Sequence, residues 1–282
     1  MPRRIQSPSS INTFKQCPRK YYYQYIMRLP TGENIHLIRG KIVHDVLENF
    51  YKIDNEKLTD NNYMEHMSMH IKNLFMKKWD EKVDRMKATG LNDDQVAFYK
   101  EESTLMLANW ITELFTTFEV ERKKHPEETP AEVFKKIIPV SIEEEFRDEE
   151  LGVRGFVDYI EHKDGKIKIM DYKTSKNAKM SPEYKLQLAI YSLLYKIKHD
   201  KMPDKVGIWF LKHGEMCISV DQELLDHAKF EIEQIHFATE TSDIGDYQKK
   251  TSPLCKYSSG QCDFYEVCNG HKTAEEALKS KK

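Results

Sequence analysis

Apolar residues recur at helical spacing through the first fifty residues of the chain. From Ser9 to Tyr25 they come every three or four positions, with an interruption near Pro18, and a second such run follows Gly40. From about residue 63 to residue 124 the chain is rich in Met, Lys, Glu and aromatic residues and contains no proline. These patterns predict two N-terminal helices and then two or three amphipathic helices.

The pattern changes after Pro130. Residues 133 to 173 place β-branched and aromatic residues among charged ones, which is typical of strands. A helix is expected after Pro182, one or two strands over residues 206–220, and a further helix over residues 222–238. This order predicts an α/β fold in which helices flank a sheet.

Composition and charge set wider limits. The chain has 282 residues, of which 39% are hydrophobic, enough for a packed core. No run approaches the roughly 18 apolar residues of a membrane span, and the first ten residues lack the apolar middle of a signal peptide, so a cytoplasmic location is expected. Because the formal net charge is only -2, a nucleic-acid site must depend on local patterning.

A hairpin with two facing carboxylates is the most informative local signal. Asp164-Gly165, between two alternating runs, indicates a two-residue turn. Counting outward from this turn pairs Asp158 with Asp171. Like charges that face each other on a sheet repel, so a positive group is expected between them.

A divalent metal ion would satisfy this requirement. Mg²⁺ and Mn²⁺ take oxygen ligands from one or two carboxylates, water and phosphate. Strand alternation also puts Lys173 on the same face as Asp171, where its ammonium can orient the attacking water or neutralise charge on a phosphate. The alternative is a surface hairpin in which these residues make ordinary ion pairs.

Five separated segments occur in one order along the chain: SPSSINTFKQCPRKYYYQY from Ser7, RGKIVHDVLE from Arg39, GFVDYI from Gly155, IMDYKTSK from Ile169 and QLAIYSLLY from Gln187. Together with the cysteines near the end, they resemble the RecB-like nucleases of the PD-(D/E)XK superfamily, specifically those with an iron–sulfur cluster. These include AddB-type nuclease domains and CRISPR-associated spacer-processing exonucleases. The resemblance implies a restriction-endonuclease-like α/β core with a mixed central sheet flanked by helices, a helical insertion and a cysteine-rich metal-cluster segment.

The resemblance spans most of the chain and implies one nuclease domain over residues 1–282. Within it we expect N-terminal helices in residues 1–52, the helical insertion in 53–130, the catalytic sheet and its helices in 131–240, and the cysteine-rich tail in 241–282.

The resemblance also implies roles for individual residues. His44, Asp158 and Asp171, with the backbone carbonyl of Tyr172, would hold the metal ion, and Lys173 would be the catalytic lysine. A lone histidine on a helix is more often structural or solvated, so the role of His44 depends on the other motifs.

Two further motifs lie around this set. Gln187 and Tyr191 match the family's Gln-x-x-x-Tyr motif, near the site and the DNA. Tyr191 could equally belong to the core, whereas Gln187 on an apolar helical stripe needs a buried polar partner. One of Glu143, Glu144 and Glu145 would correspond to an additional family glutamate, and the run of three leaves the choice open.

The cysteines suggest a second metal centre. A disulfide framework is not expected in a cytosolic chain, and four thiolates suit a [4Fe–4S] cluster or a Zn²⁺ ion. The resemblance favours an iron–sulfur cluster bound by Cys17, Cys255, Cys262 and Cys268. The separation of Cys255 from Cys262 is wider than the family's usual Cys-x-x-Cys, which keeps Zn²⁺ or no metal as alternatives. Cys217 is expected to be a buried structural thiol.

These features predict a divalent-metal-dependent DNA nuclease. By resemblance it would be an exonuclease on single-stranded or frayed DNA ends in repair or recombination, with a helicase or a repair or CRISPR protein as a partner. Two alternatives remain open: a CRISPR spacer-processing nuclease, and a non-catalytic DNA-binding scaffolding subunit.

Overall fold

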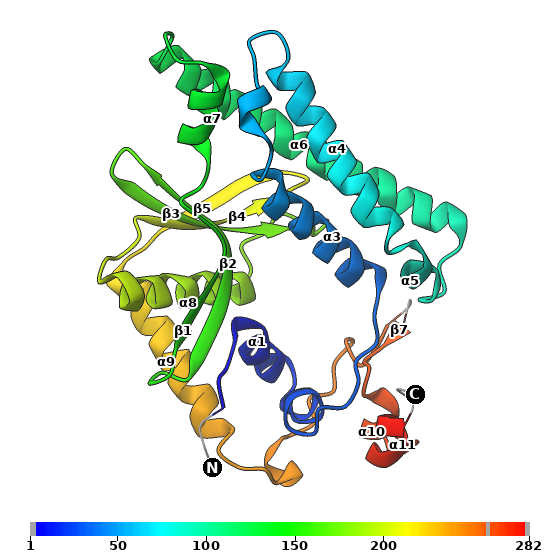
Figure 1. Ribbon diagram of the computed structural model, residues 1–282. Coiled ribbons are helices and arrows are strands. Elements are labelled where there is room, and N and C mark those ends of the chain that lie inside the picture. The colour runs from blue at the N-terminus through cyan, green and yellow to red at the C-terminus, as the bar shows by residue number, and fades with distance from the viewer. Residues whose placement is uncertain (1–3, 258–259, 280–282) are drawn as a thin grey trace.

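A computed structural model describes residues 4–257 and 260–279 (Figure 1). Residues 1–3, 258–259 and 280–282, which belong to the predicted N-terminal and C-terminal segments, lie outside the described part. The N-terminal half is helical: α1 (Pro8–Gln16), α2 (Pro18–Tyr21), η1 (Tyr22–Ile26), α3 (Ile35–Phe50), η2 (Asn55–Lys57), α4 (Tyr63–Asp80), α5 (Val83–Lys87), α6 (Asp93–Lys124) and α7 (Pro130–Ile137).

The C-terminal half contains the strands: β1 (Ser141–Asp148), β2 (Val153–Lys163), β3 (Lys166–Lys173), α8 (Pro182–His199), β4 (Lys205–Phe210), β5 (Gly214–Ser219), α9 (Gln222–Ala238), η3 (Ile244–Asp246), β6 (Lys256–Tyr257), β7 (Gly260–Gln261), α10 (Tyr265–Cys268) and α11 (Ala274–Lys279). Over these described residues, no helix is both long and apolar enough to cross a membrane.

A five-stranded sheet lies between two layers of helices. Its strands run in the order β1-β2-β3-β4-β5, and all neighbours are antiparallel except β3 and β4, which are parallel and joined through α8. Figure 1 shows α3, α4 and α6 on one side of the sheet and α8 and α9 on the other, and each layer forms a hydrophobic core with the sheet. The expected mixed α/β fold is confirmed.

The core on the α3 side is built from large aromatic side chains. The Phe50 ring from α3 packs edge-to-face on Trp110 of α6, with ring centroids 4.9 Å apart. The indole N–H of Trp110 donates to the hydroxyl of Tyr172 on β3 at 3.1 Å. The long helix α6 is therefore bonded directly to the strand that carries the predicted catalytic residues.

The predicted hairpin forms with the expected turn. Asp164 and Gly165 both have positive φ, 52° and 74°, as a two-residue hairpin turn requires. The β2–β3 pairing begins beside this turn and runs outward to Tyr159↔Met170. The next pair in this register would be Asp158↔Asp171, and it is absent from the ladder, so the expectation of a direct cross-strand pair is wrong.

The reason is that β2 and β3 stop pairing with each other after Tyr159 and Met170, so the sheet divides between these two strands. Val157 packs in the core on the α8 side, but Tyr159, two residues further along β2, packs on the α3 side, so the strand does not keep strict alternation. Val157 pairs with β1, whereas Asp171 of β3 pairs with Ile208 of β4. The two strands separate where their aspartates lie, which leaves room for side chains from both helix layers.

Two helix boundaries differ from the sequence expectation. Helix α3 begins at Ile35, before Gly40, because Asn34 caps it by accepting from a backbone N–H at 3.0 Å. Residues 133–137 are helical instead of extended. Thr129 and Glu132 form a capping box with Pro130 in the first turn, and this local signal outweighs the β-branched composition.

Replacing Phe50 by Ala should lower the free energy of unfolding by about 3–5 kcal/mol, because this side chain is 0% exposed and its loss leaves a cavity against Trp110. Urea unfolding at 25 °C measures the change. Phe237, on α9 and 76% exposed, is the matched control, for which the same replacement should change stability by less than about 0.5 kcal/mol. Equal losses in the two variants would contradict the core assignment.

Candidate active site

Four elements bring the predicted site residues together where β2 and β3 separate. Helix α3 contributes His44, β2 contributes Asp158, β3 contributes Asp171 and Lys173, and α8 contributes Gln187. Direct contacts link them in two groups, one around each aspartate. Residues more than a hundred positions apart in the sequence thus meet at one place.

The first group surrounds Asp158. Its Oδ1 lies 2.9 Å from Nδ1 of His44, and its Oδ2 accepts a hydrogen bond from the backbone N–H of Tyr172 at 2.5 Å. Burial raises the pKa of this carboxyl. His44 and the Tyr172 amide lower it by more, so the pKa of Asp158 falls below its usual value. Burial lowers the pKa of His44, yet the Asp158 carboxylate outweighs this and raises it.

The second group surrounds Asp171, which is 3% exposed. Its Oδ1 accepts from the side-chain amide of Gln187 at 3.0 Å. Its Oδ2 lies 2.5 Å from Nζ of Lys173, an ion pair without hydrogen-bond geometry, and has no hydrogen-bond partner. Burial raises the pKa of Asp171, against the lowering effect of Lys173. For Lys173, burial lowers the pKa and the Asp171 carboxylate more than reverses this.

Gln187 and Tyr191 hold Asp171 from α8. The Gln187 amide nitrogen lies 2.6 Å from the Tyr191 hydroxyl, which is itself 3.5 Å from Oδ1 of Asp171. A Cβ atom at Gly155 would stand 2.7 Å from the Tyr191 ring, so a glycine on β2 is needed for the ring to approach. The buried polar partner that Gln187 required is therefore Asp171.

Among the three consecutive glutamates, the structure directs Glu143 to the site. Glu144 pairs with Lys198, and Glu145 pairs with Arg154. Glu143 has a φ of 53° within β1, a conformation that non-glycine residues rarely adopt. Partial burial of its carboxyl and the negative charge of Asp158 raise the pKa of Glu143 to about 7. The strained backbone has no signal in the sequence, so the choice could not be made there.

The four predicted cluster cysteines line one cavity of about 160 Å³. This cavity joins the α1–α2 junction, which carries Cys17, to the tail, which carries Cys255, Cys262 and Cys268. All four are free thiols. Cys217 is exposed, and its thiol lies 3.7 Å from the Met170 sulfur. The expectation of a buried Cys217 is wrong, because β5 is the edge strand of the sheet.

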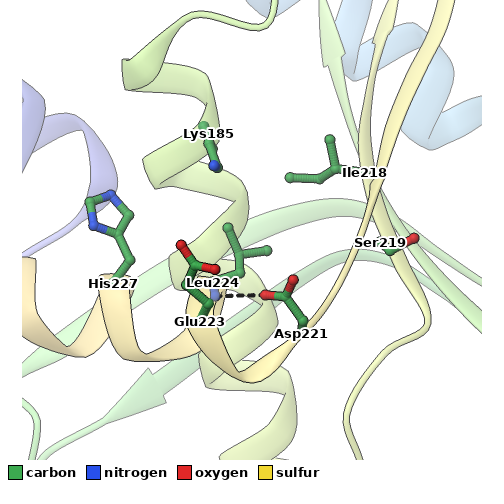
Figure 2. A pocket seen from close by; sticks show the side chains of 7 residues that line it. All are labelled: Lys185, Ile218, Ser219, Asp221, Glu223, Leu224 and His227. Atoms are coloured by element: carbon green, nitrogen blue, oxygen red, sulfur yellow. Dashed lines mark hydrogen bonds between the residues drawn. The ribbon is translucent and has the colours of Figure 1, made fainter.

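A separate pocket of about 340 Å³ lies between α8, the end of β5 and the start of α9 (Figure 2). Its α8 residue, Lys185, is two positions from Gln187 and so about 200° around the helix, away from the aspartates. Asp221 in this pocket accepts from the Leu224 amide at 2.8 Å and caps α9. The pocket contains none of the predicted site residues.

The comparison with protein families decides the identity of the fold. The model of the PD-(D/E)XK nuclease superfamily matches residues 6–269, which include both aspartates and all four cysteines of the tail cavity. The chain belongs to the PD-(D/E)XK nuclease superfamily. In this nuclease, Asp171-Tyr172-Lys173 matches the (D/E)XK pattern of the family name, and the fold is the restriction-endonuclease-like core that the sequence predicted.

Solved structures resemble this nuclease, and one of them has a name that states an activity. It is a crystal structure of a protein named "Putative exonuclease" from Eubacterium rectale, with a TM-score of 0.49 and 11% sequence identity, and the match covers 90% of this chain and 86% of that chain. No curated protein matches the sequence.

PD-(D/E)XK nucleases typically use divalent metal ions, and the donors here fit such an ion. Asp158 and Asp171 offer carboxylate oxygens, and the buried Oδ2 of Asp171 has the Lys173 ammonium beside it but no partner with hydrogen-bond geometry. The Lys173 ammonium provides the positive charge that the sequence required beside Asp171, and His44 provides it beside Asp158 when its ring is protonated. Exchanging a lysine contact for a cation would leave both oxygens of Asp171 satisfied.

A second group of potential ligands lies at the end of α6. Among the residues that the structure describes, His125, Glu127 and Glu128 form the one set of three whose ligand atoms all lie within 4.8 Å of one another. Glu128 already pairs with Lys136 at 2.5 Å, and none of these residues was predicted for the site. We assign no metal to this group.

Replacing Glu143 by Gln should flatten the pH dependence of stability in metal-free protein. Because its pKa rises from 4.5 to about 7 on folding, the native state binds more protons than the unfolded state between these values, and stability falls as pH rises through this window. The variant should therefore be more stable than the wild type at pH 8 by on the order of 0.5–1 kcal/mol, since water screens the carboxyl.

Urea unfolding at pH 5 and pH 8 with EDTA present checks this expectation. Glu145→Gln is the control, because it removes the same charge from an exposed neighbour that pairs with Arg154. If the stability of Glu143→Gln falls with pH as steeply as that of the wild type, then the charge of Asp158 does not raise the pKa of Glu143.

Proposed function

We propose that this nuclease hydrolyses DNA in a reaction that depends on Mg²⁺ or Mn²⁺. The observation that carries the proposal is the convergence of Asp158, Asp171 and Lys173, each buried or half-buried, at the division of the sheet. Buried like charges are costly unless they are compensated, and they concentrate at functional sites. An ordinary surface hairpin, the alternative reading of these three residues, would leave them in water.

His44, Asp158 and Asp171, with the backbone carbonyl of Tyr172, would hold the metal. When bound, a divalent ion lowers the pKa of a water molecule and neutralises charge on the phosphate. Gln187 and Tyr191 contact Oδ1 of Asp171, so Oδ2, which lies beside the Lys173 ammonium, would be the oxygen available to the ion.

Lys173 supplies the fixed positive charge of the site. Its ammonium lies beside Oδ2 of Asp171 and 5.5 Å from the centre of the Tyr184 ring. In this position it can orient the attacking water and stabilise the charge that develops on the phosphate oxygens. Because Asp171 keeps the pKa of Lys173 raised, the ammonium stays charged at neutral pH.

We further propose an exonuclease of the RecB-like, iron–sulfur branch, acting in the cytoplasm on single-stranded or frayed DNA ends in repair or recombination. The ordered motifs from Ser7 to Tyr195 support this branch, as does the shared cysteine cavity. On this reading residues 1–282 form one nuclease domain with the four segments that the sequence suggested. A helicase or repair protein is its proposed partner, and CRISPR spacer processing is the second candidate role.

We propose an iron–sulfur cluster for the cysteine cavity, with zinc as the alternative. Tetrahedral zinc, with Zn–S bonds of ~2.3 Å, holds its sulfurs about 3.8 Å apart. Across the described residues, no three of the cysteines have their sulfurs within 4.8 Å of one another. The position of Cys17, Cys255, Cys262 and Cys268 around one cavity, together with the resemblance, supports a [4Fe–4S] cluster, which would join the two ends of the chain.

Cleavage of end-labelled DNA in Mg²⁺ or Mn²⁺ should be lost in Asp171→Asn, by on the order of 10²-fold or more, because this variant loses the carboxylate charge. Gel analysis of single-stranded and double-stranded substrates measures the rate and the direction of degradation. Asp94→Asn, on the exposed first turn of α6, should cleave at the wild-type rate.

The outcomes separate the nuclease from a scaffolding subunit. Equal cleavage by wild type and Asp171→Asn would assign the activity to another site or to a contaminant. DNA binding without cleavage by any of the three proteins would favour the non-catalytic role.

Replacing Cys268 by Ala should reduce iron content, visible colour and melting temperature together, because the cluster links the tail to the α1–α2 junction. Anaerobic purification followed by iron analysis, absorption spectroscopy and thermal unfolding measures the three quantities. Cys217→Ala, a cysteine outside the cavity, should leave all three unchanged. Unaltered iron content in Cys268→Ala would overturn the cluster assignment. Zinc in place of iron in the wild-type protein would assign the four cysteines to a zinc site instead.

A further inference from the structure

A buried arginine lies immediately behind the proposed catalytic lysine. Arg39, on α3 and 4% exposed, donates from Nη2 to the backbone carbonyl of Thr174 at 3.2 Å. Thr174 follows Lys173 directly and is the first residue after β3. The guanidinium also lies over the Tyr99 ring, 5.4 Å from its centre.

The charge of this arginine is neutralised from the helical insertion. Glu102 of α6 forms an ion pair with Nη1 of Arg39 through one carboxylate oxygen. Its other oxygen lies 2.5 Å from Nζ of Lys212. A carboxylate that binds two cations in a partly buried setting fixes the direction of the guanidinium fork, so Arg39 can reach both Glu102 and Thr174.

The same cluster also holds the neighbouring strand. Lys212 follows Leu211, whose backbone N–H donates to the carbonyl of Lys173 at 3.0 Å. The Leu211 carbonyl accepts from the side chain of Asn109, another α6 residue, at 3.1 Å. The Thr174 carbonyl is therefore bonded to Arg39 of α3, which pairs with Glu102 of α6. The Lys173 carbonyl is bonded to Leu211, which is bonded in turn to α6.

We propose that Arg39, directed by Glu102, is a positioning residue that fixes the backbone at Lys173–Thr174 and so places the lysine ammonium beside Asp171. This inference rests on the proposed nuclease function. It makes the helical insertion part of the catalytic apparatus, because α6 supplies the carboxylate that orients Arg39. A displacement of about 1 Å at a reacting group can lower a rate by about 10²-fold, so the loss of one backbone contact is sufficient to matter.

The decisive variant is Arg39→Lys. An ammonium can keep the ion pair with Glu102, but it lacks the planar fork that donates to two acceptors in fixed directions. Arg39→Lys should therefore fold and bind DNA with unchanged KM, while kcat for DNA cleavage falls about 10- to 100-fold. Arg147→Lys, at an exposed ion pair on β1, is the matched control and should keep the wild-type kcat.

Hydrogen exchange gives a readout that does not require cleavage. The Leu211 amide, bonded to Lys173, should exchange at least about tenfold faster in Arg39→Lys than in the wild type. The Leu114 amide, in the buried part of α6, should not change and so reports on global stability. Glu102→Gln, which keeps the shape of the side chain and removes its charge, should shift Leu211 exchange in the same direction.

The two readouts distinguish the possible failures. Wild-type kcat and wild-type Leu211 exchange in Arg39→Lys would overturn the positioning role while the nuclease proposal stands. An inactive wild type in which Arg39→Lys still accelerates Leu211 exchange would remove the proposed function and retain the anchoring of this backbone. Equal acceleration at Leu211 and Leu114 would show that Arg39 acts only on global stability, which also overturns the inference.

Discussion

The burial of two carboxylates at one point of the sheet is the constraint on which the rest of this structure depends. Asp158 and Asp171 lie where β2 and β3 stop pairing, and each is compensated separately, Asp158 by His44 and Asp171 by Lys173 and Gln187. These partners come from α3, β3 and α8, so both helix layers must pack correctly for either charge to be tolerated. Because two buried carboxylates need compensating positive charge, the same site would also favour a bound cation.

The helical insertion is bound to this arrangement by polar contacts as well as by its core. The Trp110 indole bonds the hydroxyl of Tyr172, and Glu102 pairs with Arg39, which bonds the backbone after the proposed catalytic lysine. Helix α6 therefore reaches β3 both on the α3-side face of the sheet and at the end of the strand. An insertion that touches the sheet in this way supports the site directly and is more than an attached surface layer.

Local signals explain which parts the sequence predicts and which it does not. Asp164-Gly165 defines the hairpin turn because few pairs of residues accept a positive φ at both turn positions. Periodicity predicts both ends of α9 to the residue. The separation of β2 from β3 depends on packing of both faces, so the direct pairing of the aspartates was predicted wrongly. Glu143 and the Arg39–Glu102 pair depend on backbone strain and on long-range contact, neither of which leaves a local pattern.

Metal binding in the absence of DNA tests the central claim most directly. Titration calorimetry with Mn²⁺ should detect binding to the wild-type protein, because Asp158 and Asp171 supply paired carboxylate oxygens. In Asp171→Asn the affinity should fall by at least about tenfold, with the fold unchanged by circular dichroism. Equal Mn²⁺ affinity in the two proteins would contradict the account, because the ion would then bind somewhere other than at the division of the sheet.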